Sequence, residues 1–263
     1  MSSVAVETAH APARIDVRAL SVEVGPPHAR IATLDGIDVD IAPGQFVCVL
    51  GPSGCGKSTL LGAIAGHIAV TRGRIAVDDE TVDRPHPGRG LVFQLHTLFP
   101  WKRVIDNVAF GLKMKGIGAH ERRRQAGELL ELVGLGGFDT HYPAQLSGGM
   151  QQRVEIARVL INRPRVLLMD EPFGALDAQT RRMMHRLLLD IWAKLRMTVV
   201  FVTHDIEEAL FLSDRILLLS KRPARVVADI AVPLPRPRSD DTTLDPTFID
   251  IKRRCLSLLR DTA

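Results

Sequence analysis

Residues 51–59, which read GPSGCGKST, restrict the possible folds of this chain more than any other stretch. Gly51, Gly56, Lys57 and Ser58 match the pattern of two glycines separated by four residues and followed by a lysine and a hydroxyl residue. Glycine permits turns that a side chain forbids, so successive N–H groups can point at phosphate oxygens while the lysine reaches the terminal phosphates. The apolar stretch before this loop predicts a buried strand, and the stretch after it predicts a helix, whose N-terminus favours an anion.

The alternative for this motif is a glycine-rich turn that only joins a strand to a helix. The motifs that follow in the chain argue against it, so we expect the whole loop to bind nucleotide phosphates. Its residues are Gly51, Pro52, Ser53, Gly54, Cys55, Gly56, Lys57, Ser58 and Thr59.

The charge of the chain is mildly basic. Of its 263 residues, 46% are hydrophobic and 24% are charged, as in an ordinary folded protein. The formal net charge of +4 is spread over basic groups at 122–124, 181–182 and 252–254, which indicate either a nucleic-acid or membrane-surface patch or solvated helix faces. Aromatic residues make up only 5% of the chain and do not alternate with these groups, so bases have little to stack on. We favour solvated helix faces and expect no nucleic-acid partner.

The cysteines and the apolar runs bear on the compartment. Cys48, Cys55 and Cys255 show neither a CxxC pair nor metal-ligand spacing, so a disulfide framework is not expected and a reducing cytosol fits best. No apolar run reaches the ~18 residues that a membrane span needs, and the first residues lack the pattern of a secretory signal. We expect any membrane association to be through a partner.

The apolar pattern also predicts how the elements follow one another. Residues 1–13 are typical of a flexible tail, and residues 14–41 alternate as an antiparallel pair of strands that could form a ledge for a nucleotide base. A strand and turn follow the phosphate-loop helix, and residues 88–94 predict a strand that ends at Gln94. From residue 95 to about 163 the spacing becomes helical, which predicts an inserted lobe.

Within that lobe, Phe99, Pro100 and Trp101 stand in a row. The proline predicts a loop, in which a large aromatic pair is less readily buried. The row is either a docking surface for another protein or a packed corner of the lobe.

The lobe ends at a second helix start that is suited to an anion. Ser147 is a natural N-cap, and Gly148 and Gly149 allow close backbone approach. An apolar helix face follows, made of Val154, Ala157, Leu160 and Ile161. Alone, the pattern fits an ordinary capped helix equally well; the acidic motif about twenty residues later favours the anion site.

That acidic motif, RVLLMDEP at 165–172, predicts a buried parallel strand that delivers Asp170 and Glu171 at its carboxyl end. Ligands of α/β sheets lie at that end, so Asp170 can help Ser58 to hold Mg²⁺, and Glu171 can act on water as general base. The alternative for the two acids is a helix N-cap with a first-turn acid. A later strand ends at His204; a histidine there is usually structural, but its strand runs parallel to that of Glu171, so His204 could reach the terminal phosphate.

In this order and spacing the motifs make the chain resemble an ABC transporter ATP-binding subunit over residues 14 to about 220. The resemblance implies an α/β fold: a P-loop NTPase (RecA-like) core with an antiparallel β ledge and an inserted α-helical lobe. The chain would divide into a flexible tail, an ATPase domain interrupted by the lobe, and a C-terminal extension, at 1–13, 14–222 (core 14–94 and 164–222, lobe 95–163) and 223–263. The extension reads as a proline-rich connector followed by a short amphipathic helix.

The same resemblance implies a role for each motif residue. The cofactors would be ATP and Mg²⁺. Lys57 would contact the phosphates, Glu171 would be the base and His204 would contact the γ-phosphate. The residues around Mg²⁺ would be Ser58, Gln94 and Asp170.

Two copies would be needed for a complete site. Ser147, Gly148 and Gly149 would bind the ATP held by the other subunit, and Asp177 would lie at the contact between the copies. The active form would therefore be a head-to-tail homodimer with two nucleotides at its interface.

Residues 98–112, residues 203–210 and the C-terminal tail look most similar to importer ATPases of the nitrate, sulfonate and taurine branch. Such a subunit would bind integral membrane permease subunits, and an external solute-binding protein would be part of the same complex. The subunit would lie peripherally on the cytoplasmic face of the inner membrane. The surface that permeases usually grip follows Gln94, which favours the docking interpretation of Phe99 to Trp101. The alternatives are an importer ATPase for an unrelated solute and a soluble ABC-type ATPase acting on nucleic acid or ribosomes. The soluble class typically carries two cassettes or a long coiled-coil insertion, and this chain has neither.

Two features depart from the family pattern. The family's signature sequence reads LSGGM at residues 146–150 of this chain, with Met150 where glutamine is usual. Ser147 and both glycines are intact, so we expect activity to survive. The ledge that commonly stacks a tyrosine on adenine offers Val22 and Val24 and no aromatic residue, a loss of about 1 to 2 kcal/mol of stacking.

Overall fold

The central strands of the main sheet are short runs in which nearly every residue is buried. Such runs suit parallel strands because both faces of a parallel sheet are covered. In the computed structural model, which describes residues 11–26, 28–95 and 97–261, the strands of this sheet are β3 (Phe46–Leu50), β6 (Arg89–Val92), β7 (Val166–Asp170), β8 (Thr198–Val202), β9 (Arg215–Leu219) and β10 (Val226–Ala231). Their order is β10-β9-β3-β8-β7-β6, and all neighbouring pairs are parallel except β10 with β9.

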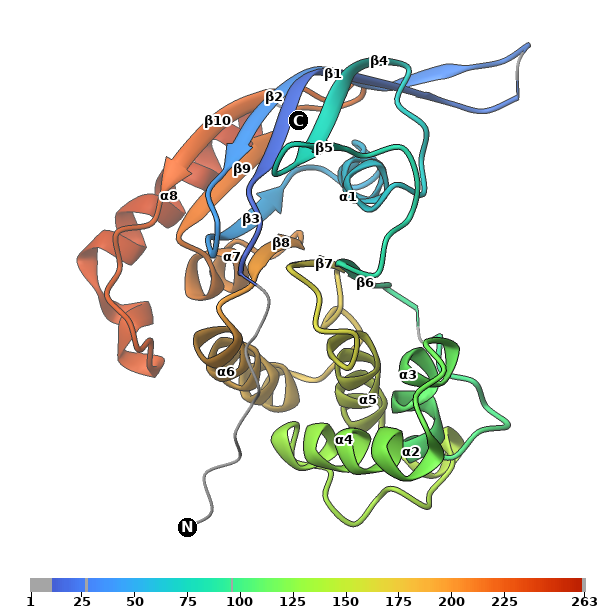
Figure 1. The fold of residues 1–263 in the computed structure, drawn as a ribbon. Coiled ribbons are helices and arrows are strands. Elements are labelled where there is room, and N and C mark those ends of the chain that lie inside the picture. The colour runs from blue at the N-terminus through green and yellow to red at the C-terminus, as the bar shows by residue number, and fades with distance from the viewer. Residues whose placement is uncertain (1–10, 27, 96, 262–263) are drawn as a thin grey trace.

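A smaller antiparallel sheet covers one side of the molecule. Its strands are β1 (Ile15–Val24), β2 (Ile31–Ile41), β4 (Arg72–Val77) and β5 (Glu80–Thr81), in the order β2-β1-β4-β5. The pairing of β1 with β2 confirms the antiparallel pair predicted for residues 14–41. Helix α1 (Lys57–Ala65) lies between this sheet and the main sheet (Figure 1). Its start is thereby held at the edge of the main sheet where β3 ends.

The helical segments other than α1 lie on the other side of the main sheet (Figure 1). The part predicted as a lobe contains α2 (Val104–Val108), α3 (Phe110–Met114), α4 (Ala119–Leu132), a 3-10 turn at Pro143–Gln145 and α5 (Gly148–Leu160). The later helical elements are α6 (Ala178–Leu195), α7 (Ile206–Leu212), a 3-10 turn at Asp240–Leu244 and α8 (Pro246–Asp261).

Alternate residues of each central strand point to two separate hydrophobic cores. In β3, Val47 and Val49 pack toward α1 and the small sheet, whereas Phe46, Cys48 and Leu50 pack toward the helices on the other face. The main sheet is therefore held rigidly from both sides. A rigid sheet fixes the relative positions of the residues that follow its strands.

The structure corrects three predictions about the elements. A flexible tail is predicted for residues 1–13, of which residues 1–10 lie outside the described residues. Ala13 does not belong to such a tail, because it is fully buried and its carbonyl accepts a hydrogen bond of 2.6 Å from the Thr198 hydroxyl. The strand predicted to end at Gln94 ends at Val92. Residues 226–231 form the edge strand β10, which the proline-rich surroundings concealed.

Candidate active site

Four neighbouring strands deliver the predicted site residues to one edge of the main sheet. The phosphate loop follows β3, His204 follows β8, Glu171 follows β7 and Gln94 follows β6. Because these strands are parallel and adjacent, their carboxyl ends meet at the same edge. The backbone N–H of Glu171 also donates to the Val202 carbonyl at 3.0 Å, which joins the ends of β7 and β8.

The phosphate loop has a backbone that only glycine adopts readily. Gly56 has φ 129°, and a Cβ there would lie 2.9 Å from Thr33 Cγ2 and 3.0 Å from Leu34 Cδ2. The loop is thus pressed against β2. Helix α1 starts at the end of this loop with no side-chain cap and no acidic residue in its first turn, so its N–H groups face the loop without a competing anion.

Lys57 and Glu171 form the centre of the site. Lys57 is 5% exposed, and its Nζ donates to the carbonyls of Gly51 at 2.9 Å and Pro52 at 3.1 Å. The same Nζ lies 3.8 Å from Glu171 Oε1, and the other carboxylate oxygen of Glu171 lies 2.9 Å from His204 Nδ1. A cation, a carboxylate and an imidazole are therefore connected across three strands of the sheet.

Ser58 and Asp170 form a second pair beside the first. The Ser58 hydroxyl donates to Asp170 Oδ1 at 3.0 Å. Burial raises the pKa of the Asp170 carboxyl, and the charge of Glu171 adds to this rise, whereas the Ser58 hydrogen bond opposes it. A half-buried carboxylate and a hydroxyl are oxygen donors that suit Mg²⁺, so the residues present fit that ion. Gln94 is exposed and makes no hydrogen bond to another described residue.

Cys55 is enclosed in the phosphate loop. It is 2% exposed, and burial raises the pKa of its thiol. All three cysteines are free, as the sequence predicted. The thiol of Cys55 therefore stays protonated, and we assign it no chemical role.

The predicted signature residues lie apart from the phosphate loop of the same chain. Ser147 caps α5 by accepting from the Met150 N–H at 3.3 Å, and Ser147 and Gly148 are exposed. No hydrogen bond or ion pair joins residues 147–149 to residues 51–59, all of which the structure describes. Asp177 caps α6 by accepting from the N–H groups of Gln179 and Thr180 at 3.0 Å each. The sequence analysis considered a helix N-cap as the alternative role of Asp170 and Glu171. In the structure the residue that caps the following helix is Asp177.

The structure narrows the predicted base ledge. Val22 is fully buried within the small sheet, so it cannot face a nucleotide base. Val24 is half-buried and remains available. Of the two valines, only Val24 therefore stands where an aromatic ring could contact a nucleotide base.

Two contacts at the site involve residues that sequence reasoning missed. A guanidinium N–H of Arg222, in the turn between β9 and β10, donates to the Gly54 carbonyl at 2.7 Å. The Thr203 hydroxyl, next to His204, donates to the carboxylate of Glu208. Arg222 is 168 residues from Gly54 in sequence, and no local pattern signals a contact of that range.

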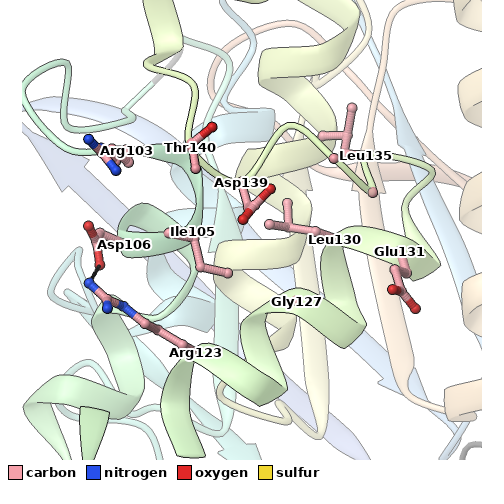
Figure 2. Close-up of a pocket in the computed structure, with 12 residues that line it drawn as sticks. Arg103, Ile105, Asp106, Arg123, Gly127, Leu130, Glu131, Leu135, Asp139 and Thr140 are labelled. Atoms are coloured by element: carbon pink, nitrogen blue, oxygen red, sulfur yellow. Dashed lines mark ion pairs between the residues drawn. The ribbon is translucent and has the colours of Figure 1, made fainter. Parts of the chain in front are cut away.

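A separate hollow of about 540 Å³ lies in the helical lobe, between α2, α4 and the segment after α4 (Figure 2). Its lining carries both charges, including Arg103, Asp106 and Arg123, and Arg123 lies 3.6 Å from Asp106. None of the predicted site residues lines it. This hollow is therefore separate from the predicted nucleotide site at the sheet edge.

Comparisons with known proteins agree with the motifs. The profile of the ABC transporter family matches residues 34–174. The chain is 48% identical to an uncharacterised ABC transporter ATP-binding protein of Methanocaldococcus jannaschii, over 88% of this chain and 86% of that protein. It is 48% identical to the taurine import ATP-binding protein of Rhizobium johnstonii, over 88% and 90% of the two chains. It is 46% identical to the nitrate import ATP-binding protein of a Synechocystis strain, over 88% and 89%.

Solved structures give the same result at the level of the fold. The chain is similar to a dimeric ATP-binding cassette in a post-hydrolysis state with ADP and phosphate, with a TM-score of 0.73 and 32% identity over 83% of this chain and 98% of that one. Another dimeric structure of the same cassette gives a TM-score of 0.74 and 33% identity over the same shares. The fold is therefore the predicted α/β P-loop NTPase fold, and the chain belongs to the ABC transporter family of ATP-binding proteins.

Proposed function

We propose that this chain is the ATP-hydrolysing subunit of an importer for small oxyanions of the nitrate, sulfonate or taurine type. Membership of the ABC family supports ATP binding and hydrolysis, and the relatives named for taurine and nitrate import support the direction of transport and the class of solute. The observation that carries the catalytic part is the position of Glu171, 3.8 Å from Lys57 Nζ and 2.9 Å from His204 Nδ1.

In the proposed reaction the side chains act mainly by position and charge. The N–H groups of residues 51–59 and the Lys57 ammonium bind the phosphates. Glu171 accepts a proton from the attacking water, whose oxygen bonds to the γ-phosphorus while the bond from that phosphorus to the β,γ-bridging oxygen breaks. His204 holds the other carboxylate oxygen of Glu171 and contacts the γ-phosphate. ADP and phosphate are the products.

Ser58, Asp170 and Gln94 are proposed to hold Mg²⁺, which would neutralise charge on the phosphates. The raised pKa of Asp170 supports this assignment, because a bound cation relieves the cost of ionising a partly buried carboxyl. Gln94 leaves β6 beside β7, from which Asp170 and Glu171 project.

The nucleotide is proposed to lie between two copies arranged head to tail. Ser147, Gly148 and Gly149 of one copy would face the ATP bound by the other, and Asp177 would lie at the contact. The exposure of Ser147 and Gly148 supports this proposal, as does the dimeric state of both similar solved structures.

The permease is proposed to dock on the lobe near Trp101. This side chain is 72% exposed, and its ring lies 5.7 Å from Phe99, which in turn lies 4.8 Å from Phe110. Arg103 and Asp106 line both the hollow next to Trp101 and the hollow of Figure 2, so the surface is continuous and carries both charges. A single exposed tryptophan with a polar rim is typical of an interface anchor.

Importer subunits of this kind work with membrane permeases and an external solute-binding protein, and we propose the same partners here, with the chain bound peripherally to the cytoplasmic face of the inner membrane. Within the described residues no helix is both long and apolar enough to cross a bilayer. We also propose that the chain divides into a tail, an ATPase domain that contains the lobe, and an extension, with boundaries after residues 13 and 222. Strand β10 continues the main sheet beyond the second boundary.

Two arginines of the group at 122–124 support transport over nucleic-acid binding. Arg124 pairs with Glu121 at 2.6 Å and with Glu128 at 2.5 Å on the surface of α4, and Arg123 pairs with Asp106. Paired arginines on a helix face leave little net positive field for a phosphate backbone. We propose that nucleic acid is not a partner.

ATP turnover of the purified chain, compared with Glu171→Gln, tests the catalytic proposal. We expect the variant to be slower by about 10²-fold or more, because it retains the shape but loses the base. With ATP and Mg²⁺ it should sediment as a dimer, because ATP stays bound. The control is Glu207→Gln, an exposed acid that pairs with Lys252 and should keep the wild-type rate. If Glu171→Gln hydrolyses as fast as wild type, Glu171 is not the base.

Uptake by the host cell tests the solute. Deleting this chain should abolish uptake of labelled taurine, of another sulfonate, or of nitrate, and each solute is assayed separately. Retention of all three would contradict the proposed solute class while leaving the ATPase proposal intact.

A further inference from the structure

A buried hydrogen-bonded network of three side chains lies directly behind His204, and the sequence analysis assigned no role to any of the three. They are Thr203, Glu208 and His185, which are 2%, 6% and 7% exposed. Polar groups at this depth are costly to bury unless each finds its partners, so such a network has a defined geometry.

Glu208 is the centre of this network. Its Oε1 lies 2.6 Å from His185 Nε2, and its Oε2 accepts from the Thr203 hydroxyl. The same hydroxyl accepts from the backbone N–H of Asp205 at 3.0 Å. Thr203 and Asp205 are the two neighbours of His204 in the chain, so the network fixes the backbone on both sides of the histidine.

The network also connects this turn to α6. His185 lies on α6, where its ring is 5.6 Å from that of Phe173 and 5.9 Å from that of Phe211. Helix α6 begins at Ala178, directly after its N-cap Asp177. Near this start Thr180 packs closely on Gly149: a Cβ added to Gly149 would lie 2.5 Å from Thr180 Cγ2. Packed contacts thus run from the predicted signature residues through α6 to His204 and Glu171.

We propose that Thr203, Glu208 and His185 are positioning residues for ATP hydrolysis, which hold His204 so that its Nδ1 faces Glu171. The inference rests on the proposed roles of His204 and Glu171. None of the hydrogen bonds described for these three side chains goes to residues 51–59. The network therefore acts on the rate of hydrolysis and not on the affinity for ATP.

Thr203→Val tests the proposal, because valine keeps the size of threonine and removes the hydroxyl. We expect kcat for ATP to fall about tenfold while the Kd of a fluorescent ATP analogue stays within about twofold. Thr203→Ser keeps the hydroxyl and should restore the rate. His185→Leu removes the outer partner of Glu208 and should lower kcat about threefold with the same Kd.

Thr198→Val is the matched control. Thr198 is also fully buried and lies at the opposite end of β8, where its hydroxyl donates to the Ala13 carbonyl and accepts from the Gly44 N–H at 2.9 Å. This variant should melt at a lower temperature than wild type but keep the wild-type kcat. Comparing Thr198→Val with Thr203→Val separates the effect of losing any buried hydroxyl from the effect of losing the hydroxyl beside His204.

A double-variant cycle with His204→Ala gives the deciding result. If Thr203 acts through His204, the double variant is no slower than His204→Ala alone. The proposal is overturned if Thr203→Val keeps the wild-type kcat, or if the two losses multiply in the double variant. If instead His204→Ala itself hydrolyses at the wild-type rate, the proposed role of His204 fails, and the network proposal fails with it for that distinct reason.

Discussion

At the edge of the main sheet where the predicted site residues meet, Glu171 is held in a backbone conformation that most residues avoid. Glu171 has φ 42° although it carries a side chain, and its backbone is fixed by the hydrogen bond to Val202. Left-handed backbone at a non-glycine residue costs of order 1–3 kcal/mol and persists where the surroundings impose it. Here it points the carboxylate between Lys57 and His204.

Asp170→Asn should stabilise the protein in the absence of nucleotide at neutral pH. Burial raises the pKa of Asp170 above its ordinary value of 3.8, so ionisation is less favourable in the folded than in the unfolded chain. The stability that the neutral acid gives is present below 3.8 and is lost as the pH rises through the raised pKa. We therefore expect a higher melting temperature for the variant at pH 7, and a difference that shrinks as the pH is lowered toward 4.

The same variant should gain less melting temperature than wild type from ATP with Mg²⁺, because it lacks the proposed ligand. Asp83→Asn, a change at an exposed acid outside the site, controls for the loss of one negative charge. A variant that melts below wild type at pH 7 without nucleotide contradicts the assigned cost of burying Asp170.

At the scale of elements, the C-terminal extension divides into parts with different roles. Strand β10 completes the main sheet by pairing with β9, and Arg236 and Arg238 bond to the carbonyls of α7 residues Leu212 and Leu210. Helix α8 packs on α7 and buries Phe248 and Cys255 in the core on the helical face of the sheet. The extension therefore covers the core and supports the helix that follows His204.

Phe248→Ala should lower the free energy of unfolding by about 3–5 kcal/mol, because it removes a ring that is 2% exposed and leaves a cavity between α8 and α7. Urea denaturation measures this change. Leu244→Ala, at a side chain that is 73% exposed, should change stability by about 0.5 kcal/mol or less. Equal effects of the two substitutions would show that α8 does not hold the core.

At the scale of the whole molecule, the proposed site is divided between two separate regions of one chain. The sheet edge holds Lys57 and Glu171, whereas Ser147 and Gly148 are exposed at the start of α5 and make no hydrogen bond to the phosphate loop of the same chain. A head-to-tail pair would bring each half to its complement. This arrangement makes activity depend on which variants share a dimer.

Mixing Lys57→Ala with Gly148→Asp should recover ATPase activity that neither variant has alone. A mixed dimer joins an intact phosphate loop from one copy to an intact signature from the other. With equal amounts, about half of the dimers are mixed and each has one complete site of two, so we expect about a quarter of the wild-type rate. The rate is measured after the chains are mixed without nucleotide and ATP is then added.

Lys57→Ala mixed with Glu171→Gln is the control for that experiment. Both changes affect the same half of the site, so every combination remains defective and no activity should return. Failure of the first mixture to exceed the sum of its components would contradict a shared site.

The sequence alone determined the glycine-rich loop at 51–59, the capped start of α5 and the acidic end of β7, because each depends on a short local pattern of glycines, caps or apolar runs. The class of fold followed from the resemblance of these motifs, in their order and spacing, to the ABC transporter family. Tertiary structure alone decided which residues meet. The order β3-β8-β7-β6 places His204 beside Glu171, and packing buries Val22, pairs β10 with β9 and brings Arg222 to Gly54. The physical reason is that periodicity reports which side of an element is buried. It carries no information about which distant element does the burying, since that follows from strand order and the packing of both faces of the sheet.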